Sequence, residues 1–164
     1  MSHRLDELAR ILTSELELTR KLLDLAKDAR AAVVSADPEL LAEIVAEQEE
    51  WSARLEVSEA RRVQLVLELG RELGIGEEPG LKTIVEKAPR EEGLRLRNVG
   101  RQLRKVAGQL RETGRRNSML LKQATANVDS FFELLSRACR KGSGYRPDGR
   151  DQGARKATVL DQQI

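Results

Sequence analysis

Hydrophobic residues recur at alternating intervals of three and four along one long stretch of the chain, with a few polar residues among them. The positions are Leu96, Val99, Leu103, Val106, Leu110, Thr113, Asn117, Leu120, Ala124, Asn127, Phe131, Leu134 and Ala138. This spacing is a heptad repeat, which is typical of a helix with one long apolar seam. The repeat follows Pro89 and predicts a helix over residues 90–141. At roughly 1.5 Å per residue this helix is about 75 Å long, so another element must lie alongside it.

The residues beside this seam change in size along the helix. They are small in the first part and large in the second: Gly93, Gly100, Ala107 and Gly114 are followed by Leu121, Val128 and Leu135. Small residues permit the close approach of another backbone, whereas the larger ones widen the apolar stripe. We therefore expect the two halves to have different neighbours. Thr113 and Asn117 place a polar layer at the centre, which can fix the register of helix packing.

Two amphipathic helices precede the long one. They are predicted over residues 4–34 and 38–73. Between them, Asp37 can cap the second helix and Pro38 suits its first position, so the short turn predicts an antiparallel hairpin. The first helix carries two apolar stripes, which implies two neighbours; the stripes are formed by Leu5, Leu8, Leu12, Leu16 and Leu23, and by Ile11, Leu18, Leu22, Leu25 and Ala29.

The remaining segments are short or lack periodicity. Glycine and proline interrupt residues 74–89 and leave only residues 81–87 for a short helix. Residues 142–164 have the composition of a flexible tail. The predicted fold is therefore all-α: an antiparallel helical hairpin, a short connecting helix and one long C-terminal helix in a coiled-coil-like bundle. We expect a helical domain over residues 1–141, with Leu22 and Leu65 in its core, followed by the tail.

The composition agrees with long helices and coiled coils, because 34% of the residues are charged and 40% are hydrophobic. One Trp, one Tyr and two Phe cannot fill a large globular core, whereas aliphatic seams need few aromatic residues. No run approaches the roughly 18 apolar residues of a membrane span. The first residues also lack the pattern of a signal peptide. We therefore expect a cytoplasmic protein.

Residues suited to catalysis are scarce. Cys139 is the single cysteine and His3 the single histidine, so neither an intrachain disulfide nor a Cys/His nucleophile or metal site can be assembled. Asp129 and Glu133 share a helix face, but such pairs are common on solvated surfaces. The glycines of the tail follow no strand and form no phosphate loop. We expect no enzyme, no cofactor and no small-molecule ligand.

Charge is distributed unevenly along the chain, although the formal net charge is only +2. Residues 1–89 carry 12 Lys or Arg and 19 Asp or Glu, whereas residues 90–164 carry 17 and 8. One interpretation is that oppositely charged helices of one bundle attract each other. The other is that a basic helix meets an acidic partner or a nucleic acid.

Three local patterns, in this order, resemble the FlgN family of flagellar type III export chaperones. The first is the turn Ala36-Asp37-Pro38-Glu39-Leu40, followed by Glu47-Gln48-Glu49-Glu50. The second is Asn117-Ser118-Met119-Leu120-Leu121, which is similar to an Asn-x-x-Leu-Leu signature on the long helix of the family. The third is Gly144-Tyr145-Arg146-Pro147-Asp148-Gly149, which is similar to a tyrosine and turn beyond the last helix. The run of arginines from Arg95 to Arg116 departs from the family pattern.

The resemblance implies a chaperone that binds C-terminal helical segments of hook-associated proteins and prevents their premature assembly. It also implies delivery of these clients to the export gate and ATPase complex of the flagellar type III apparatus, with Tyr145 docking to the gate. Helices of about 45 to 55 Å cannot cover one of about 75 Å, so the long helix should project beyond them after about residue 124. The predicted client-binding residues are Asn117, Leu120, Leu121, Val128, Phe131, Phe132 and Leu135.

Several alternatives stay open at this point. The distal apolar residues could instead form a homodimer, or a bend near Gly114 could fold them back onto the hairpin. The second function is a basic, nucleic-acid-associated helical protein, because the arginines of the long helix face few carboxylates; the absence of base-stacking aromatic residues there disfavours nucleic acid as a partner. The third function is a structural coiled-coil adaptor.

Overall fold

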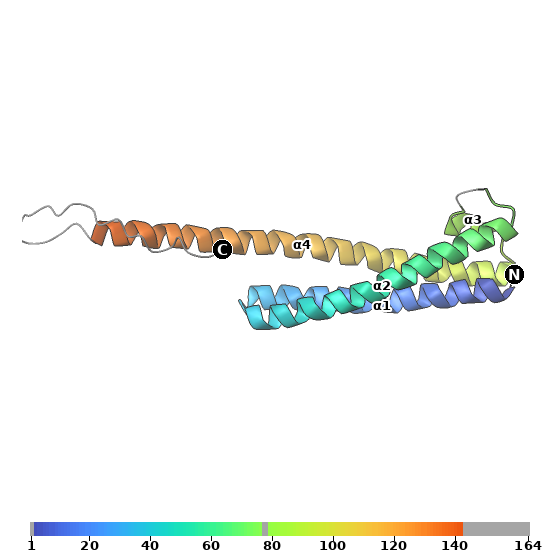
Figure 1. Cartoon of the computed structure of the whole chain (residues 1–164), viewed down its shortest axis with the longest axis horizontal. Helices are drawn as coiled ribbons and strands as arrows, with labels where there is room; N and C mark the ends of the chain where they lie inside the picture. Colours follow the sequence, from blue (N-terminus) through green and yellow to red (C-terminus); the bar gives the residue numbers. More distant parts are fainter. Residues whose placement is uncertain (1, 77–78, 143–164) are drawn as a thin grey trace, which may run out of the picture. The chain divides into compact units, whose positions relative to one another are not determined.

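The computed structural model describes residues 2–76 and 79–142, and their side chains as far as Ala138. In this part the chain forms four α-helices and no strand: α1 (Ser2–Val34), α2 (Pro38–Glu72), α3 (Leu81–Lys87) and α4 (Arg90–Gly142) (Figure 1). The all-α class is confirmed, and each predicted helix end agrees with the observed one within two residues. The predicted tail lies outside the described residues except for Gly142, where α4 ends.

The chain divides into two compact units, Met1–Gln123 and Ala124–Ile164. The first unit contains α1, α2, α3 and the first part of α4. The described part of the second unit is the remainder of α4. The predicted domain boundary after residue 141 stays a prediction.

A tight turn joins α1 to α2. Ala36 has left-handed backbone with a φ of 54°. The carboxylate of Asp37 accepts a hydrogen bond from the backbone N–H of Leu40 at 3.0 Å, and Pro38 begins the helix. Glu39 adds negative charge to the first turn, where the helix dipole favours it. The predicted cap and the antiparallel hairpin are therefore confirmed (Figure 1).

The main hydrophobic core joins all four helices where α1 begins and α2 ends. Its buried members are Leu5, Leu8, Ala9, Ile11, Leu12, Leu65, Val66, Leu69, Ile84, Val85 and Leu96. Although α3 has only seven residues, its Ile84 is fully buried. The short connecting helix thus closes this end of the bundle, since without it these aliphatic side chains would face water.

A second, smaller core lies near the turn of the hairpin and involves only α1 and α2. It contains Leu25, Ala29, Ala32 and Ile44, with Leu41 and Trp51 packed at its edge. Between the two cores, α1 also buries Leu22. Leu22 and Leu65, the two leucines expected in the core, are 6% and 5% exposed.

Two hydrogen bonds define the direction of α4. The guanidinium of Arg95 donates to the carboxylate of Asp6 at 3.1 Å, and the side-chain amide of Asn117 donates to the carbonyl oxygen of Ala26 at 2.7 Å. The partners are separated by 89 and 91 residues, so α4 runs parallel to α1 and antiparallel to α2. Because α1 ends at Val34, the same offset provides α4 with this neighbour only up to about residue 124.

Two of the small residues beside the seam allow α4 to approach α3 closely. A Cβ atom added at Gly93 would lie 2.9 Å from the carbonyl oxygen of Val85, and one at Gly100 would lie 3.2 Å from the side chain of Leu81. At Gly114 an added Cβ would meet nothing within 4 Å. The expected close approach therefore occurs at the start of α4 and is lost farther along.

Candidate functional site

The seam of α4 is covered in its first part and open to solvent in its second. Leu96 is 1% exposed, and the following seam positions are half-buried at Val99, Leu103, Val106, Leu110 and Leu120. Every described side chain from Leu121 to Ala138 is exposed. The change occurs close to the position at which α1 ceases to be a neighbour. An apolar pattern therefore continues along α4 without a cover.

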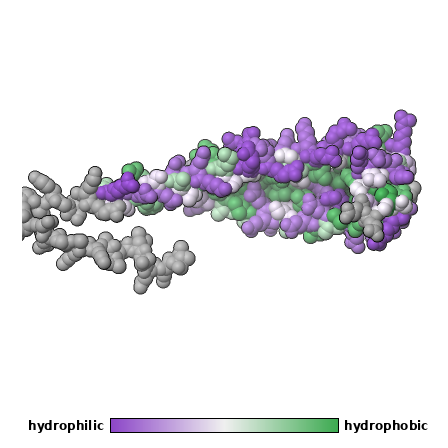
Figure 2. Space-filling view, turned by 90° about the horizontal axis from the view of Figure 1, so that it is seen from above, coloured by the Kyte–Doolittle hydropathy of each residue, from purple (hydrophilic) through white to green (hydrophobic). Residues whose placement is uncertain are grey.

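Five large apolar side chains occupy this uncovered part, and we call them the distal apolar face. They are between 44% and 62% exposed: Val128, Phe131, Phe132, Leu134 and Leu135. Both phenylalanines of the chain are included. In the space-filling view, green hydrophobic groups appear among purple hydrophilic ones along this part of α4 (Figure 2). Such a concentration of exposed apolar surface is typical of an interaction site.

Helix geometry brings these side chains together. Val128, Phe131 and Leu135 are spaced at i, i+3 and i+7, which places them on one side of α4. Phe132 follows Val128 by four residues and extends the same surface. The rings of Phe131 and Phe132 meet edge to face, with centroids 6.4 Å apart and an angle of 65° between their planes. The face thus offers two rigid aromatic groups beside aliphatic ones, an arrangement suited to packing against another helix.

Polar groups occupy the other side of this part of α4. Glu133 and Arg137 form an exposed ion pair at 3.7 Å, and the hydroxyl of Ser130 donates to the carbonyl oxygen of Ala126 at 2.9 Å. These interactions are local to one helix. Among the described residues, no group of three or more His, Cys, Asp or Glu side chains could hold a metal ion. This part of α4 can therefore bind a partner through apolar packing, with charged groups along the edge of the contact.

The structure separates the predicted client-binding residues into two groups. Asn117 donates its hydrogen bond to α1, and its side-chain oxygen is buried without a partner among the described residues. Leu120 is half-buried. By contrast, Leu121 is 42% exposed, and the four that follow it, Val128, Phe131, Phe132 and Leu135, belong to the distal apolar face. Asn117 therefore contacts the bundle, as a register-fixing polar residue would.

Two further expectations concern the end of the chain. Tyr145, the predicted docking residue, lies outside the described residues. The alternative in which the chain bends back near Gly114 receives no support from the structure, because α4 continues as one helix from Arg90 to Gly142. Self-association through the distal apolar face stays an open alternative.

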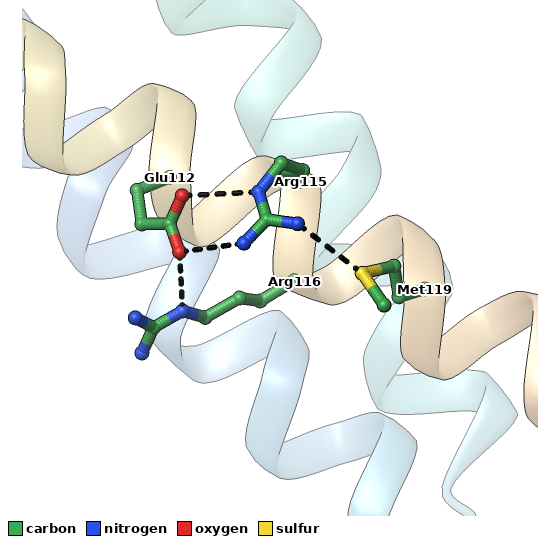
Figure 3. A network of polar contacts seen from close by, with 4 residues as sticks. All are labelled: Glu112, Arg115, Arg116 and Met119. Atoms are coloured by element: carbon green, nitrogen blue, oxygen red, sulfur yellow. Dashed lines mark hydrogen bonds and ion pairs between the residues drawn. The ribbon is translucent and has the colours of Figure 1, made fainter.

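Some cations of the basic stretch are neutralised inside the chain. Arg95 pairs with Asp6 of α1 at 3.1 Å, which agrees with attraction between oppositely charged helices. Farther along α4, Glu112 accepts hydrogen bonds from both Arg115 and Arg116 (Figure 3). These hydrogen bonds lower the pKa of Glu112 to about 2.

A buried ion pair was not anticipated from the sequence. Glu15 of α1 is 1% exposed, and both of its carboxylate oxygens lie 2.9 Å from Nε of Arg62 in α2. Burial raises the pKa of the Glu15 carboxyl, although Arg62 opposes the shift. A signal existed, because Glu15 lies at helical spacing from Leu8, Leu12 and Leu22 on a mostly apolar stripe of α1. Glu15 and Arg62 lie at the bottom of a groove that residues of α1, α2 and α4 line, which is the position of a structural ion pair between packed helices.

Comparison with known proteins decides the family. A model of the FlgN family, described as FlgN protein, matches residues 1–153. The chain belongs to the FlgN family. This is a family of flagellar export chaperones, whose members bind flagellar hook-associated proteins. The resemblance seen in the sequence is therefore confirmed, and the chain is a chaperone of flagellum biogenesis with a helical-bundle fold. No curated protein and no solved structure matches the chain.

None of the described helices is long and apolar enough to span a membrane.

Proposed function

We propose that this chain binds the C-terminal helical segments of hook-associated proteins in the cytoplasm and prevents their premature assembly. It then delivers them to the export gate and ATPase complex of the flagellar type III apparatus. Family membership supports the class of protein and the class of client. The distal apolar face supports the place of binding, because it is the one part of the α4 seam that lacks a neighbour among the described residues.

The exposure of Phe131 and Phe132 is the observation that carries this proposal. Their side chains are 59% and 62% exposed, on a helix whose seam is buried or half-buried only from Leu96 to Leu120. Exposing two phenylalanines costs free energy that burial against a partner would recover, at roughly 25 cal/mol per Å² of apolar surface. An amphipathic client helix can pack against them with its own residues at i, i+3 and i+7. Leu121 and Leu120 extend this surface toward the bundle, and Asn117 forms its border.

Two substitutions test the client site. Phe131→Asp and Leu135→Asp each place a charge in the proposed contact. Loss of a central anchor costs about 2 kcal/mol or more, so the affinity for a C-terminal peptide of a hook-associated protein should fall at least about 30-fold. Helicity and melting temperature should remain nearly unchanged, because both side chains are already exposed. Isothermal titration calorimetry with the full chain measures the affinity.

Val57→Asp and Val63→Asp are the matched controls, since these α2 valines are 73% and 50% exposed. They should bind the client peptide with wild-type affinity. Equal weakening by the controls would show that the added charge acts nonspecifically. Unfolding of the Phe131 and Leu135 variants would mean that the distal apolar face is core, and the client site would have to lie elsewhere.

Docking of Tyr145 to the export gate rests on the family resemblance. Tyr145→Ala should leave client affinity and melting temperature unchanged while reducing secretion of the hook-associated proteins. Wild-type secretion by this variant would reject the assignment.

A further inference from the structure

Four arginines lie along one side of α4, and we call them the arginine row: Arg97, Arg101, Arg104 and Arg111. They are spaced at i, i+4, i+7 and i+14, which places them on one face of the helix, opposite the seam positions Val99 and Val106. All four side chains are exposed. The row therefore presents guanidinium groups to solvent along the side of α4 that faces away from its seam, with Arg111 at the edge of a groove shared with α2.

The arginine row differs from the neighbouring cations because its members form no ion pair with the residues that the structure describes, although Glu59 lines the same groove as Arg111. Arg95 pairs with Asp6, while Arg115 and Arg116 share Glu112 (Figure 3). None of the four row arginines forms an ion pair or hydrogen bond within the described part of the chain. The acidic hairpin thus neutralises cations at its own surface, and the outer side of α4 keeps its charge.

This row is unfavourable for the isolated helix. Like charges at i, i+3 and i, i+4 repel each other, so the row lowers the stability of α4. Gly108 lies on the same side, between Arg104 and Arg111, and glycine inside a helix lowers its stability further. A Cβ atom at Gly108 would meet nothing within 4 Å, so packing inside the chain does not require glycine there. Both features become favourable when a counter-charged partner approaches α4 closely.

We propose that the arginine row binds one acidic α-helix of a partner protein. This helix lies along α4 from Arg97 to Arg111, a length of about 21 Å at roughly 1.5 Å per residue. Its carboxylates face the guanidinium groups, which can accept each carboxylate with two parallel hydrogen bonds. One of its side chains occupies the notch over Gly108. The site is independent of the distal apolar face and of the client bound there.

The surroundings of the row favour a single helix over a nucleic acid. Arg111 and Glu59 line the same groove between α4 and α2, so a carboxylate of the hairpin lies beside the end of the row. An α-helix with its side chains is about 10 to 12 Å across and can cover the row alone. A wider polyanion would also approach the acidic hairpin, where its phosphates would be repelled.

Nor does the row offer bases a stacking surface. Of the described aromatic residues, Trp51 lies on α2 with Lys21 and Arg54 against its ring, and the two phenylalanines lie in the distal apolar face. Binding of single strands commonly relies on aromatic stacking beside the basic groups. The chemistry of the row therefore fits carboxylates on a protein helix.

The test uses the full chain and a fluorescein-labelled helical peptide with glutamates at i, i+4, i+7 and i+14. Fluorescence anisotropy at about 150 mM salt should show tighter binding of this peptide than of a peptide with the same composition and glutamates spread around the helix. The triple variant Arg97→Gln/Arg101→Gln/Arg104→Gln should bind the first peptide about tenfold more weakly. Gly108→Leu, which fills the notch, should also weaken binding while preserving helicity.

A matched control has the same change in net charge at exposed cations outside the row: Arg10→Gln/Lys82→Gln/Lys87→Gln. This variant should bind within about twofold of the wild type if position matters more than bulk charge. Equal binding of the two peptides, or equal loss in the control variant, would overturn the proposal. So would tighter binding of an RNA duplex than of the acidic peptide, or a concentration-dependent self-association that the triple variant abolishes.

Discussion

The two parts of α4 carry the same heptad pattern but have different surroundings. From Leu96 to Leu120 the seam is buried or half-buried in the bundle, whereas the side chains from Leu121 to Ala138 are exposed. Residue type follows this division, since Gly93 and Gly100 fit closely against α3 while the distal apolar face carries two phenylalanines. A heptad seam therefore shows which side of a helix can pack against a neighbour, but not whether a neighbour is present. Whether it becomes core or binding surface depends on the length of the neighbouring helix.

The covered and the exposed parts of the α4 seam should contribute unequally to the stability of the fold. Leu96 contributes to stability, because its removal would leave a cavity among all four helices. Phe131 contributes little, because most of its surface already contacts water. Substitutions should therefore separate stability from binding along a single helix.

The largest expected effect comes from truncating each part of the seam. Leu96→Ala should lower the free energy of unfolding by about 2 to 5 kcal/mol. Phe131→Ala should change it by less than about 0.5 kcal/mol, as is usual for exposed positions. Urea denaturation monitored by circular dichroism measures both. Equal destabilisation by the two substitutions would erase the distinction between covered and uncovered seam.

The next effect concerns the buried ion pair beneath the covered part of α4. Arg62→Leu leaves the Glu15 carboxylate buried without its cation and should cost about 3 kcal/mol at pH 7. The pKa of Glu15 is already raised by burial, and loss of Arg62 should raise it further. When the pKa of a carboxyl is higher in the folded state than in the unfolded chain, the folded state binds the proton more tightly. Lowering the pH between these two pKa values therefore stabilises the fold. The deficit of the variant should therefore shrink as the pH falls through this raised pKa toward the ordinary value of 4.5.

Arg61→Leu is the control for this prediction, because Arg61 pairs with Glu7 at the surface. It should cost much less stability than Arg62→Leu, because exposed ion pairs contribute little to folding. A loss of stability in Arg62→Leu that does not depend on pH would show that packing of the Arg62 side chain, and not its charge, is what matters.

Glycine substitutions distinguish close packing from open surface at a smaller scale. Gly108→Ala should raise the free energy of unfolding by up to about 1 kcal/mol, since the new Cβ meets nothing and alanine favours the helix. Gly93→Ala should lower it, because the new Cβ would lie 2.9 Å from the carbonyl oxygen of Val85. Thermal melts of both variants test the signs. An increase at both positions would mean that α3 and α4 are not held closely together.

The smallest effect is the titration of an exposed carboxylate. Arg115 and Arg116 hold the pKa of Glu112 at about 2, below the ordinary value of 4.5. A lowered pKa means that this cluster stabilises the fold above about pH 4.5 and loses that contribution as the pH falls toward 2. Arg115→Gln should shift the pKa of Glu112 upward in a carbon-13 NMR titration. An unchanged pKa would show that Arg115 does not hold Glu112 in solution.

Much of the fold is readable from local signals. Asp37 caps α2, Pro38 is its first residue, and Pro89 immediately precedes α4. These are local effects of capping and of the backbone conformation of proline. Apolar spacing then places Leu22 and Leu65 in the core. The distal apolar face was predicted from relative helix lengths, and its residues are exposed as that argument requires. Their binding of a client stays a prediction.

Other features depend on contacts between residues far apart in the chain. The partner of Asn117 is a carbonyl oxygen 91 residues away, and that of Glu15 is an arginine 47 residues away. Sequence patterns indicate that such a polar residue lies on an apolar face, but they do not identify the group that satisfies it. The arginine row is similar, since its lack of ion pairs depends on which carboxylates of the hairpin lie near α4.

The sequence by itself thus determined the helices, their ends and their apolar faces, because these depend on neighbours within a few residues. Only the tertiary structure decided where the seam of α4 loses its cover, which polar groups lie beneath it and which cations remain unpaired. The physical reason is that burial and charge neutralisation depend on which residues of α1 and α2 lie beside each turn of α4. That alignment is set by packing of the whole bundle, in which each residue of α1 lies beside the residue of α4 that follows it by about 90 positions in the chain.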